Sequence, residues 1–235
     1  MKETHRLDQL IAAAAPCSRR EASRLIRDSH VSVNGAVCRV VDRKVGDDDI
    51  VLLDGRRLTY CRHVYYMLYK PAGVLSATED RHERTVLDLV PASMQRDGLF
   101  PAGRLDKDTT GLLILTDDGD YAHRMLSPRR HVEKRYIATV DRMPAQDAEE
   151  RFSAGLTLSD GTCYQPASLR RIGADTVEVV LHEGRYHQVK RMLSCVGSRV
   201  IALHRESIGQ LTLDHSLSPG ELRVLSDDEA QRALR

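Results

Sequence analysis

The first sixty residues switch between helical and strand periodicity. Ser18, followed three residues later by Glu21, is a capping box, in which each side chain binds a free backbone amide at a helix start. It predicts a helix over residues 18–28 with one apolar and one basic side. Alternating apolar positions around Asn34-Gly35 predict a tight hairpin, and a further strand is expected over 50–53. These elements indicate a small separate domain over residues 1–60.

The rest of the chain mixes strand and helix patterns without regular interleaving. Alternation and apolar runs predict strands over 66–69, 112–115, 135–140, 176–181 and 200–203. Helical spacing predicts helices over 121–126, 145–154, 186–195 and 227–234. An α+β fold with a mixed, largely antiparallel sheet flanked by helices is therefore favoured over a doubly wound sheet. Residues 59–65 are the expected join, and 65–235 the second domain.

The formal net charge of +1 hides a basic N-terminal segment. Residues 1–46 carry nine Lys or Arg against five acids, a net +4, whereas residues 211–235 carry a net −2. Part of this excess is a stripe on the predicted helix, formed by Arg19, Arg20, Arg24 and Arg27. Such a stripe is more often a solvated surface than a binding face. Guanidinium groups also pair with RNA phosphates, without reading sequence.

Short motifs in this segment resemble, in order, the RNA-binding module first known from ribosomal protein S-four. The matching stretches are Arg6-Leu7-Asp8, 18–22, 31–35 and Asp49-Ile50 to Gly55. The resemblance implies that the arginine stripe faces structured RNA, which proteins recognise largely by shape.

The sequence offers no recognisable site for a nucleotide cofactor or a metal. It has neither a G-x-G-x-x-G after a strand nor a phosphate-binding G-x-x-x-x-G-K-S/T loop. His182 and His187 are five residues apart with Gly184 between them, unlike the paired histidines of a zinc helix. We therefore expect neither a cofactor nor a metal.

The cysteines and the N-terminus bear on location. Five widely spaced cysteines, an odd number without a C-x-x-C pair, suit free thiols in a reducing compartment. The apolar stretch near the N-terminus is short and mostly alanine. We expect a cytoplasmic protein without a membrane segment.

Residues 103–113 carry the strongest chemical signal. They read G-R-L-D-K-D-T-T-G-L-L, so Asp106 lies between basic residues, on a turn bounded by glycines, just before an apolar strand. A loop-to-strand junction gives a carboxylate a rigid mount and an open face. On spacing alone, the better interpretation is an Asp that caps the turn by binding nearby amides.

This stretch resembles the catalytic motif of pseudouridine synthases of the RsuA type. Residues 68–73 resemble their K-P-x-G element, 133–136 the segment that carries an active-site tyrosine, and 183–192 the closing motif of this branch. Tyr69 departs from the pattern, because Asn is commoner before Lys-Pro. With the N-terminal module, the resemblance covers nearly the whole chain. It implies an enzyme that converts uridine to pseudouridine without a cofactor.

The resemblance implies three catalytic residues. Asp106 would be the ionised carboxylate that acts at the ribose, as nucleophile or as base. Lys190 would keep it charged in a water-poor cleft, with Arg185 and Arg191 as substitutes. Tyr136 would stack on the uracil while the base turns. On spacing alone, an exposed helix lysine also fits Lys190. Without the resemblance, a strand residue half in the core fits Tyr136 equally well.

Further residues are expected at the substrate. Leu203 would form an apolar wall of the pocket, with core packing as the equal alternative. A uridine in folded RNA must leave its stack to reach Asp106, and Arg104 would fill the gap or bind its phosphates. The other candidates for RNA contact are Arg185, Arg191, Lys70, Arg124, Arg129, Arg130 and Arg135.

The predicted function is site-specific pseudouridine formation in 16S ribosomal RNA. The acidic C-terminal end and residues 203–209 look closer to the small-subunit branch than to enzymes of 23S RNA, the first alternative. A non-catalytic, ribosome-associated RNA-binding protein is the second. A glycoside hydrolase using Asp106 with Asp108 or Asp117 is the third, and the absence of tryptophan disfavours it. The expected partner is ribosomal RNA or the assembling small subunit, bound by a monomer.

Overall fold

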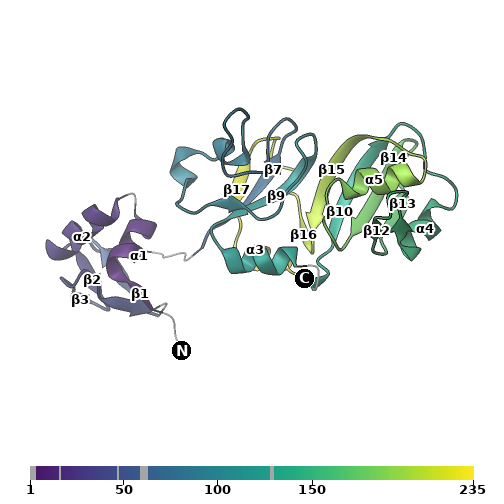
Figure 1. The fold of residues 1–235 in the computed structure, drawn as a ribbon. Coiled ribbons are helices and arrows are strands. Elements are labelled where there is room, and N and C mark those ends of the chain that lie inside the picture. The colour runs from purple at the N-terminus through teal and green to yellow at the C-terminus, as the bar shows by residue number, and fades with distance from the viewer. Residues whose placement is uncertain (1–3, 16, 47, 59–62, 128–129) are drawn as a thin grey trace. The chain divides into compact units, whose positions relative to one another are not determined.

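The computed structural model describes residues 4–15, 17–46, 48–58, 63–127 and 130–235. The chain forms two compact units, Met1–Arg62 and His63–Arg235 (Figure 1). Every helix and strand predicted from the sequence pattern is present. Of the five cysteines, Cys61 lies outside the described residues, and the other four are free thiols.

The first unit packs two helices against short strands. The helices are α1 (Leu7–Ala14) and α2 (Arg19–Arg27). One antiparallel pair joins β1 (Thr4–Arg6) to β4 (Lys44–Gly46). A four-stranded sheet has the order β3 (Ala36–Val37), β2 (Val31–Val33), β5 (Val51–Leu53) and β6 (Arg56–Arg57). The core of the unit is apolar and is built from both helices and from β2, β4 and β5.

Local sequence signals account for the helix and the hairpin of this unit. The backbone amide of Glu21 donates to the Ser18 hydroxyl, and the Ser18 amide donates to the Glu21 carboxylate at 2.8 Å, which confirms the capping box. The turn between β2 and β3 places Asn34 at φ 53° and Gly35 at φ 81°. Both residue types tolerate this left-handed conformation, and it suits the twist of a two-residue hairpin.

The second unit is built on one nine-stranded sheet. Its main order is β13 (Ser168–Arg171), β14 (Thr176–Leu181), β10 (Lys134–Val140), β15 (Val200–Ile208), β9 (Thr110–Thr116), β7 (Tyr65–Lys70) and β17 (Leu222–Val224). Short strands β16 (Leu211–Thr212) and β8 (Phe100–Pro101) pair with β15 and β9. A separate pair joins β11 (Leu156–Thr157) to β12 (Cys163–Tyr164). The β15–β9 pairing is parallel and the others are antiparallel, which confirms the predicted sheet type.

Helices cover both faces of this sheet. Alternate residues of β7 and β9 point to opposite sides, so Leu68 and Leu113 enter one apolar core and Met67 and Leu112 the other. The first core includes α4 (Ala148–Ala154) and α5 (Gln188–Cys195), and the second includes α3 (Gly119–Leu126) and α6 (Asp227–Arg232). Figure 1 shows α4 and α5 beside β10, β13 and β14, with α3 near the C-terminus. Two 3-10 turns, Val86–Leu89 and Ala92–Met94, complete the unit.

Several predicted elements differ in length from the observed ones, and the difference has a clear physical reason in three of them. Helix α4 begins at Ala148, three residues after the predicted start, because residues 145–147 form a turn. Helix α5 begins at Gln188, because His187 adopts the left-handed conformation at φ 50°. Strand β15 runs five residues beyond the predicted end at Leu203. The second half of β15 is polar and gave no strand pattern in the sequence. Alternate residues there are nevertheless buried, and β10 and β9 pair with β15 on its two sides.

Replacing Gly111 with Ala is expected to destabilise the second unit by more than about 3 kcal/mol. A Cβ atom at Gly111 would lie 2.3 Å from the Arg205 carbonyl oxygen, and its φ is +109°. The close approach of β9 to β15 therefore requires glycine. Gly161 is a matched control, because its φ is +80° but its Cβ would meet nothing within 4 Å. Gly161→Ala should cost only about 1 kcal/mol in denaturant titrations, and equal losses would contradict this account.

Candidate active site

The loop between β8 and β9 presents Asp106, and a buried lysine holds its backbone. Lys70, at the end of β7, is 0% exposed. Its ammonium lies within 2.9–3.3 Å of four carbonyl oxygens, those of Pro71, Asp106, Lys107 and Thr109. Burial lowers the pKa of Lys70 to about 8, although the nearby Asp108 and Asp106 act in the opposite direction. Lys70 therefore binds the backbone of the loop from inside the protein.

The same loop is tied to a neighbouring turn through Ser76. The Leu105 amide donates to the Ser76 hydroxyl at 3.0 Å, and that hydroxyl donates to the Leu105 carbonyl at 2.9 Å. The Gly73 amide donates to the Lys107 carbonyl at 2.7 Å. Backbone atoms on both sides of Asp106 are thus anchored, which gives its carboxylate a rigid mount.

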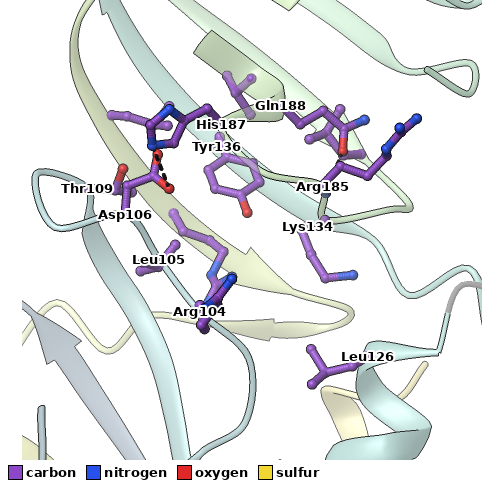
Figure 2. Close-up of a pocket in the computed structure, with 15 residues that line it drawn as sticks. Arg104, Leu105, Asp106, Thr109, Leu126, Lys134, Tyr136, Arg185, His187 and Gln188 are labelled. Atoms are coloured by element: carbon purple, nitrogen blue, oxygen red, sulfur yellow. Dashed lines mark hydrogen bonds and ion pairs between the residues drawn. The ribbon is translucent and has the colours of Figure 1, made fainter. Parts of the chain in front are cut away.

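A lysine and a histidine face the Asp106 carboxylate, whose side chain is 22% exposed. The Lys190 ammonium lies 3.1 Å from Oδ2. His187 Nε2 lies 3.6 Å from Oδ1, and Figure 2 shows these two side chains facing each other. Lys190 also donates to Asp108 at 2.6 Å. Burial acts to lower the pKa of Lys190, but the hydrogen bonds to Asp108 and Asp106 outweigh it and raise that pKa. Lys190 is therefore a firmly charged partner for Asp106.

A pocket opens beside Asp106 on the sheet face that carries α5. Its space amounts to about 570 Å³ when the open solvent at its mouth is included. Tyr136 of β10 and Leu203 of β15 line it, and both are buried. Arg104 is exposed and also lines the pocket. The structure thus brings together Asp106 and three residues that the sequence predicted to surround it.

Lys70 does not fit the role of a phosphate contact. Its side chain is fully buried, and its ammonium donates to backbone carbonyls. The prediction that Lys70 contacts RNA is therefore wrong, and Lys70 instead binds the backbone of the loop.

Arg185 and Arg191 do not act as substitutes for Lys190, because neither guanidinium contacts Asp106 among the described residues. Arg185 donates to the Cys163 carbonyl at 2.6 Å and lines the pocket, whereas Arg191 pairs with Asp160. Both guanidinium groups lie over the Tyr164 ring.

The remaining candidates for RNA contact differ in availability. Arg130 is exposed, Arg124 is half-buried, and Arg135 pairs with Glu178 at 3.1 Å. Arg129 lies outside the described residues. In the first unit Arg20, Arg24 and Arg27 are exposed and form no ion pair with another described residue. Arg19 is also exposed, but it donates to the buried Asp8 at 3.0 Å and is partly committed to the fold.

Sequence reasoning missed three residues at the pocket. His187 was considered only as a possible metal ligand, yet it faces Asp106. Lys134 and Arg205 line the pocket and are almost fully buried. Strand alternation could have found the last two, because Lys134 is two residues before Tyr136 and Arg205 two residues after Leu203, which places each pair on one sheet face.

The described residues contain no cluster of side chains suited to bind a metal ion. Within the described ranges, no three His, Cys, Asp or Glu side chains lie close enough together to hold a metal ion. His182 bonds to the His131 carbonyl at 2.9 Å, whereas His187 turns to Asp106. None of the described helices is long and apolar enough for a membrane crossing.

Replacing Lys134 with Met is expected to raise the free energy of unfolding at pH 7. Burial lowers the pKa of Lys134 to about 8, so the unfolded chain binds this proton more tightly than the folded chain. Below pH 8 the folded wild type therefore carries the full cost, about 3 kcal/mol, less about 1 kcal/mol for the hydrogen bond to Val132. The cost shrinks between pH 8 and 10.5. Denaturant titrations of both proteins at pH 7 and 10.5 test this, and a pH-independent difference would contradict it.

Comparison with protein-family models gives two matches. Residues 64–195 match the family described as RNA pseudouridylate synthase, and residues 5–59 match the S4 domain. The chain belongs to the RNA pseudouridylate synthase family. It is accordingly an enzyme of RNA modification with an N-terminal S4 domain.

Relatives of this synthase match along nearly the whole chain. The ribosomal small subunit pseudouridine synthases A of Escherichia coli (strain K12) and Salmonella typhimurium are each 42% identical over 95% of this chain and 97% of theirs. The uncharacterized RNA pseudouridine synthase YtzG of Bacillus subtilis is 39% identical over 95% of this chain and 96% of its own. A crystal structure of a pseudouridylate synthase aligns with a TM-score of 0.68 and 35% identity, covering 97% of this chain and 99% of that one. The pseudouridine-synthase fold predicted from the motifs is thereby confirmed.

Proposed function

We propose that this chain converts one uridine of 16S ribosomal RNA to pseudouridine, with Asp106 acting at the ribose of a flipped-out nucleotide. The observation that carries the proposal is the placement of the Asp106 carboxylate beside Lys190 and against a pocket lined by Tyr136 and Leu203. Pseudouridine formation exchanges a C–N bond for a C–C bond within one nucleotide. It needs a charged carboxylate near the sugar and a surface on which the base can turn.

The geometry suggests a role for each residue. Lys190 places its ammonium 3.1 Å from one oxygen of the Asp106 carboxylate, and His187 lies 3.6 Å from the other oxygen. Tyr136 offers a flat face for the uracil, because stacking tolerates rotation in the plane of the ring. Leu203 closes the pocket on its apolar side. Arg104, exposed at the pocket, binds the RNA backbone or fills the place of the flipped nucleotide.

The choice of 16S over 23S RNA rests on the relatives. Those at 42% identity are named as synthases of the ribosomal small subunit, and they match along nearly their full length. The test is to map pseudouridine in ribosomes from a strain that lacks this gene. Loss of one modified site from 16S RNA is expected, and loss from 23S RNA alone would contradict the proposal.

The first domain, over residues 1–60, is proposed to hold the RNA, and the catalytic domain spans residues 65–235. Support comes from the S4 match and from the exposed arginines of α2. Their partner would be ribosomal RNA or the assembling small subunit, bound by a monomeric enzyme.

Replacing Arg20, Arg24 and Arg27 together with Ser is expected to weaken RNA binding without loss of fold. Each phosphate contact that is removed should lower the slope of log affinity against log salt by about 1. Binding titrations at several salt concentrations give that slope. Arg56 and Arg57 of β6, also exposed and in the same domain, serve as the matched control pair. An unchanged slope in the triple variant would show that α2 does not contact RNA.

The competing functions lack support at the site. A binding protein without catalysis has no use for a carboxylate held between Lys190 and His187. For a glycoside hydrolase, Asp117 is unavailable as a second carboxylate, because it pairs with Arg96 at 2.8 Å and with His63 at 3.2 Å.

A further inference from the structure

Two buried cations without an acidic partner lie in the pocket beside Asp106. Lys134 is 5% exposed and Arg205 is 3% exposed, and both line the pocket. The Lys134 ammonium donates to the Val132 carbonyl at 3.1 Å. The Arg205 Nε donates to the Leu112 carbonyl at 2.8 Å, while its Nη2 is buried without any partner. Among the described residues, neither side chain forms an ion pair. We call them the buried cation pair.

Holding two unpaired positive charges in the interior costs stability, so their presence requires a compensating interaction. Burial first, and then Arg205, lowers the pKa of Lys134. The two charges therefore lower the stability of the free protein. A site that concentrates unpaired cations and an orphaned donor is arranged to receive negative charge from a ligand.

Strand geometry places the buried cation pair next to the proposed base platform. Tyr136 of β10 is paired in register with Arg205 of β15. Lys134 is two residues before Tyr136 and shares its sheet face. In Figure 2 the Tyr136 ring lies between Asp106 on one side and Lys134 on the other. A uracil on this ring, with its ribose at Asp106, has its far edge directed to the cations.

The chemistry moves one negative charge along this direction. When the C1′–N1 bond breaks, its electron pair goes to the base, which becomes an anion with charge shared onto its carbonyl oxygens. On the sugar side, the Asp106 carboxylate loses its charge either by bonding to C1′ or by taking a ribose proton. When C5 bonds to C1′, the base gives its electron pair back. Asp106 regains its charge in the same step, because its bond to C1′ breaks or because it returns the proton to the ribose. C5 then loses its proton and N1 gains one. In either route the charge leaves Asp106 and is carried by the detached base.

We propose that Lys134 and Arg205 bind the carbonyl oxygens of the uracil and stabilise the negative charge that the base carries while it is detached. This inference rests on the proposed function of Asp106 and deepens it. Lys190 and His187 face the Asp106 carboxylate, which carries the negative charge before cleavage. The buried cation pair faces the base, which carries the charge afterwards. Donors set in a water-poor pocket are most effective where charge develops during the reaction.

A phosphate is the less fitting ligand for these two groups. The phosphates of a flipped nucleotide continue into the RNA chain outside the pocket, where the exposed Arg104 can meet them. Lys134 and Arg205 are both more than nine-tenths buried, on the face of the same strands that carry Tyr136 and Leu203. The base is the part of the nucleotide that reaches this depth.

The test compares two leaving groups in one short RNA that carries the target site. One RNA has uridine at that site, and the other has 5-fluorouridine, whose electron-withdrawing fluorine makes the base a better leaving group. Single-turnover loss of the target nucleoside, measured by nuclease digestion and mass spectrometry, counts every event that breaks the C–N bond. Wild type, Lys134→Met, Arg205→Met and Asp106→Asn are compared at saturating enzyme, with RNA affinity measured separately.

We expect Lys134→Met and Arg205→Met to slow cleavage of uridine by about 100-fold and of 5-fluorouridine by about 10-fold or less, with RNA affinity within about threefold of wild type. Arg205→Met also removes a bond to the Leu112 carbonyl, so Lys134→Met keeps the test valid if that variant unfolds. Arg199→Met, 78% exposed, is the control and should match wild type.

Equal slowing on both RNAs would overturn the inference, because a merely structural defect does not depend on the leaving group. A loss confined to affinity would overturn it in favour of a phosphate contact. Failure of the proposed function gives a different result, in which the wild type cleaves neither RNA or Asp106→Asn cleaves both at the wild-type rate.

Discussion

Replacing Asp106 with Asn is expected to lower the single-turnover rate of pseudouridine formation by at least about 10⁴-fold. The amide has nearly the shape of the carboxylate and can still lie beside Lys190, but it can neither bond to C1′ nor take a ribose proton. Lys190 and His187 would then face an amide instead of a carboxylate. The measurement is the yield of pseudouridine against time with excess enzyme.

Asp108→Asn is the matched control for this variant. Asp108 is two residues away, is 73% exposed and is also bound by Lys190, at 2.6 Å. The hydrogen bond from Lys190 lowers the pKa of Asp108, so this carboxylate shares the charge of Lys190 without reaching the pocket lining. Its replacement should change the rate by no more than about tenfold. Similar losses of rate in both variants would contradict the assignment of the chemistry to Asp106.

Replacing Lys70 with Met is expected to cost more than about 3 kcal/mol of unfolding free energy and to abolish most activity. The change leaves four backbone carbonyl oxygens around a buried methionine without their shared donor, including that of Asp106 itself. The loop would no longer hold the carboxylate in place. Denaturant titration gives the stability and the single-turnover assay gives the activity.

Lys107→Met in the same loop separates this effect from a general loss of positive charge. Lys107 is 51% exposed and pairs with Glu83 on the surface. Its replacement should change stability by no more than about 0.5 kcal/mol. Comparable losses of stability and activity for both lysines would contradict this account, in which burial and the four carbonyl partners explain the effect of Lys70.

The sequence predicted the elements well where local signals and tertiary packing agree. The capping box at Ser18, the turn at Asn34 and the alternation over β14 all appear as expected. Boundaries were less predictable where long-range pairing decides them. The polar end of β15 becomes a strand because β10 and β9 bind it from both sides, and this information is not local.

The same distinction applies to the site. Motif order brought Asp106, Lys190 and Tyr136 together, and the structure places them around one pocket or in direct contact. Lys70 was misread because charge suggests an exposed phosphate contact, whereas the cage of carbonyls forms only when residues 71 and 106–109 meet it in space. His187 was missed because its side chain reaches Asp106 through a left-handed backbone conformation that spacing does not reveal.

The most direct test of the central claim is to incubate the purified enzyme with unmodified 16S and 23S ribosomal RNA, free and in assembling particles, and to map every pseudouridine formed. We predict a single modified uridine in 16S RNA with the wild type, and none with Asp106→Asn although that variant binds the same RNA. Modification by Asp106→Asn at the wild-type level, or modification of 23S RNA alone, would contradict the account.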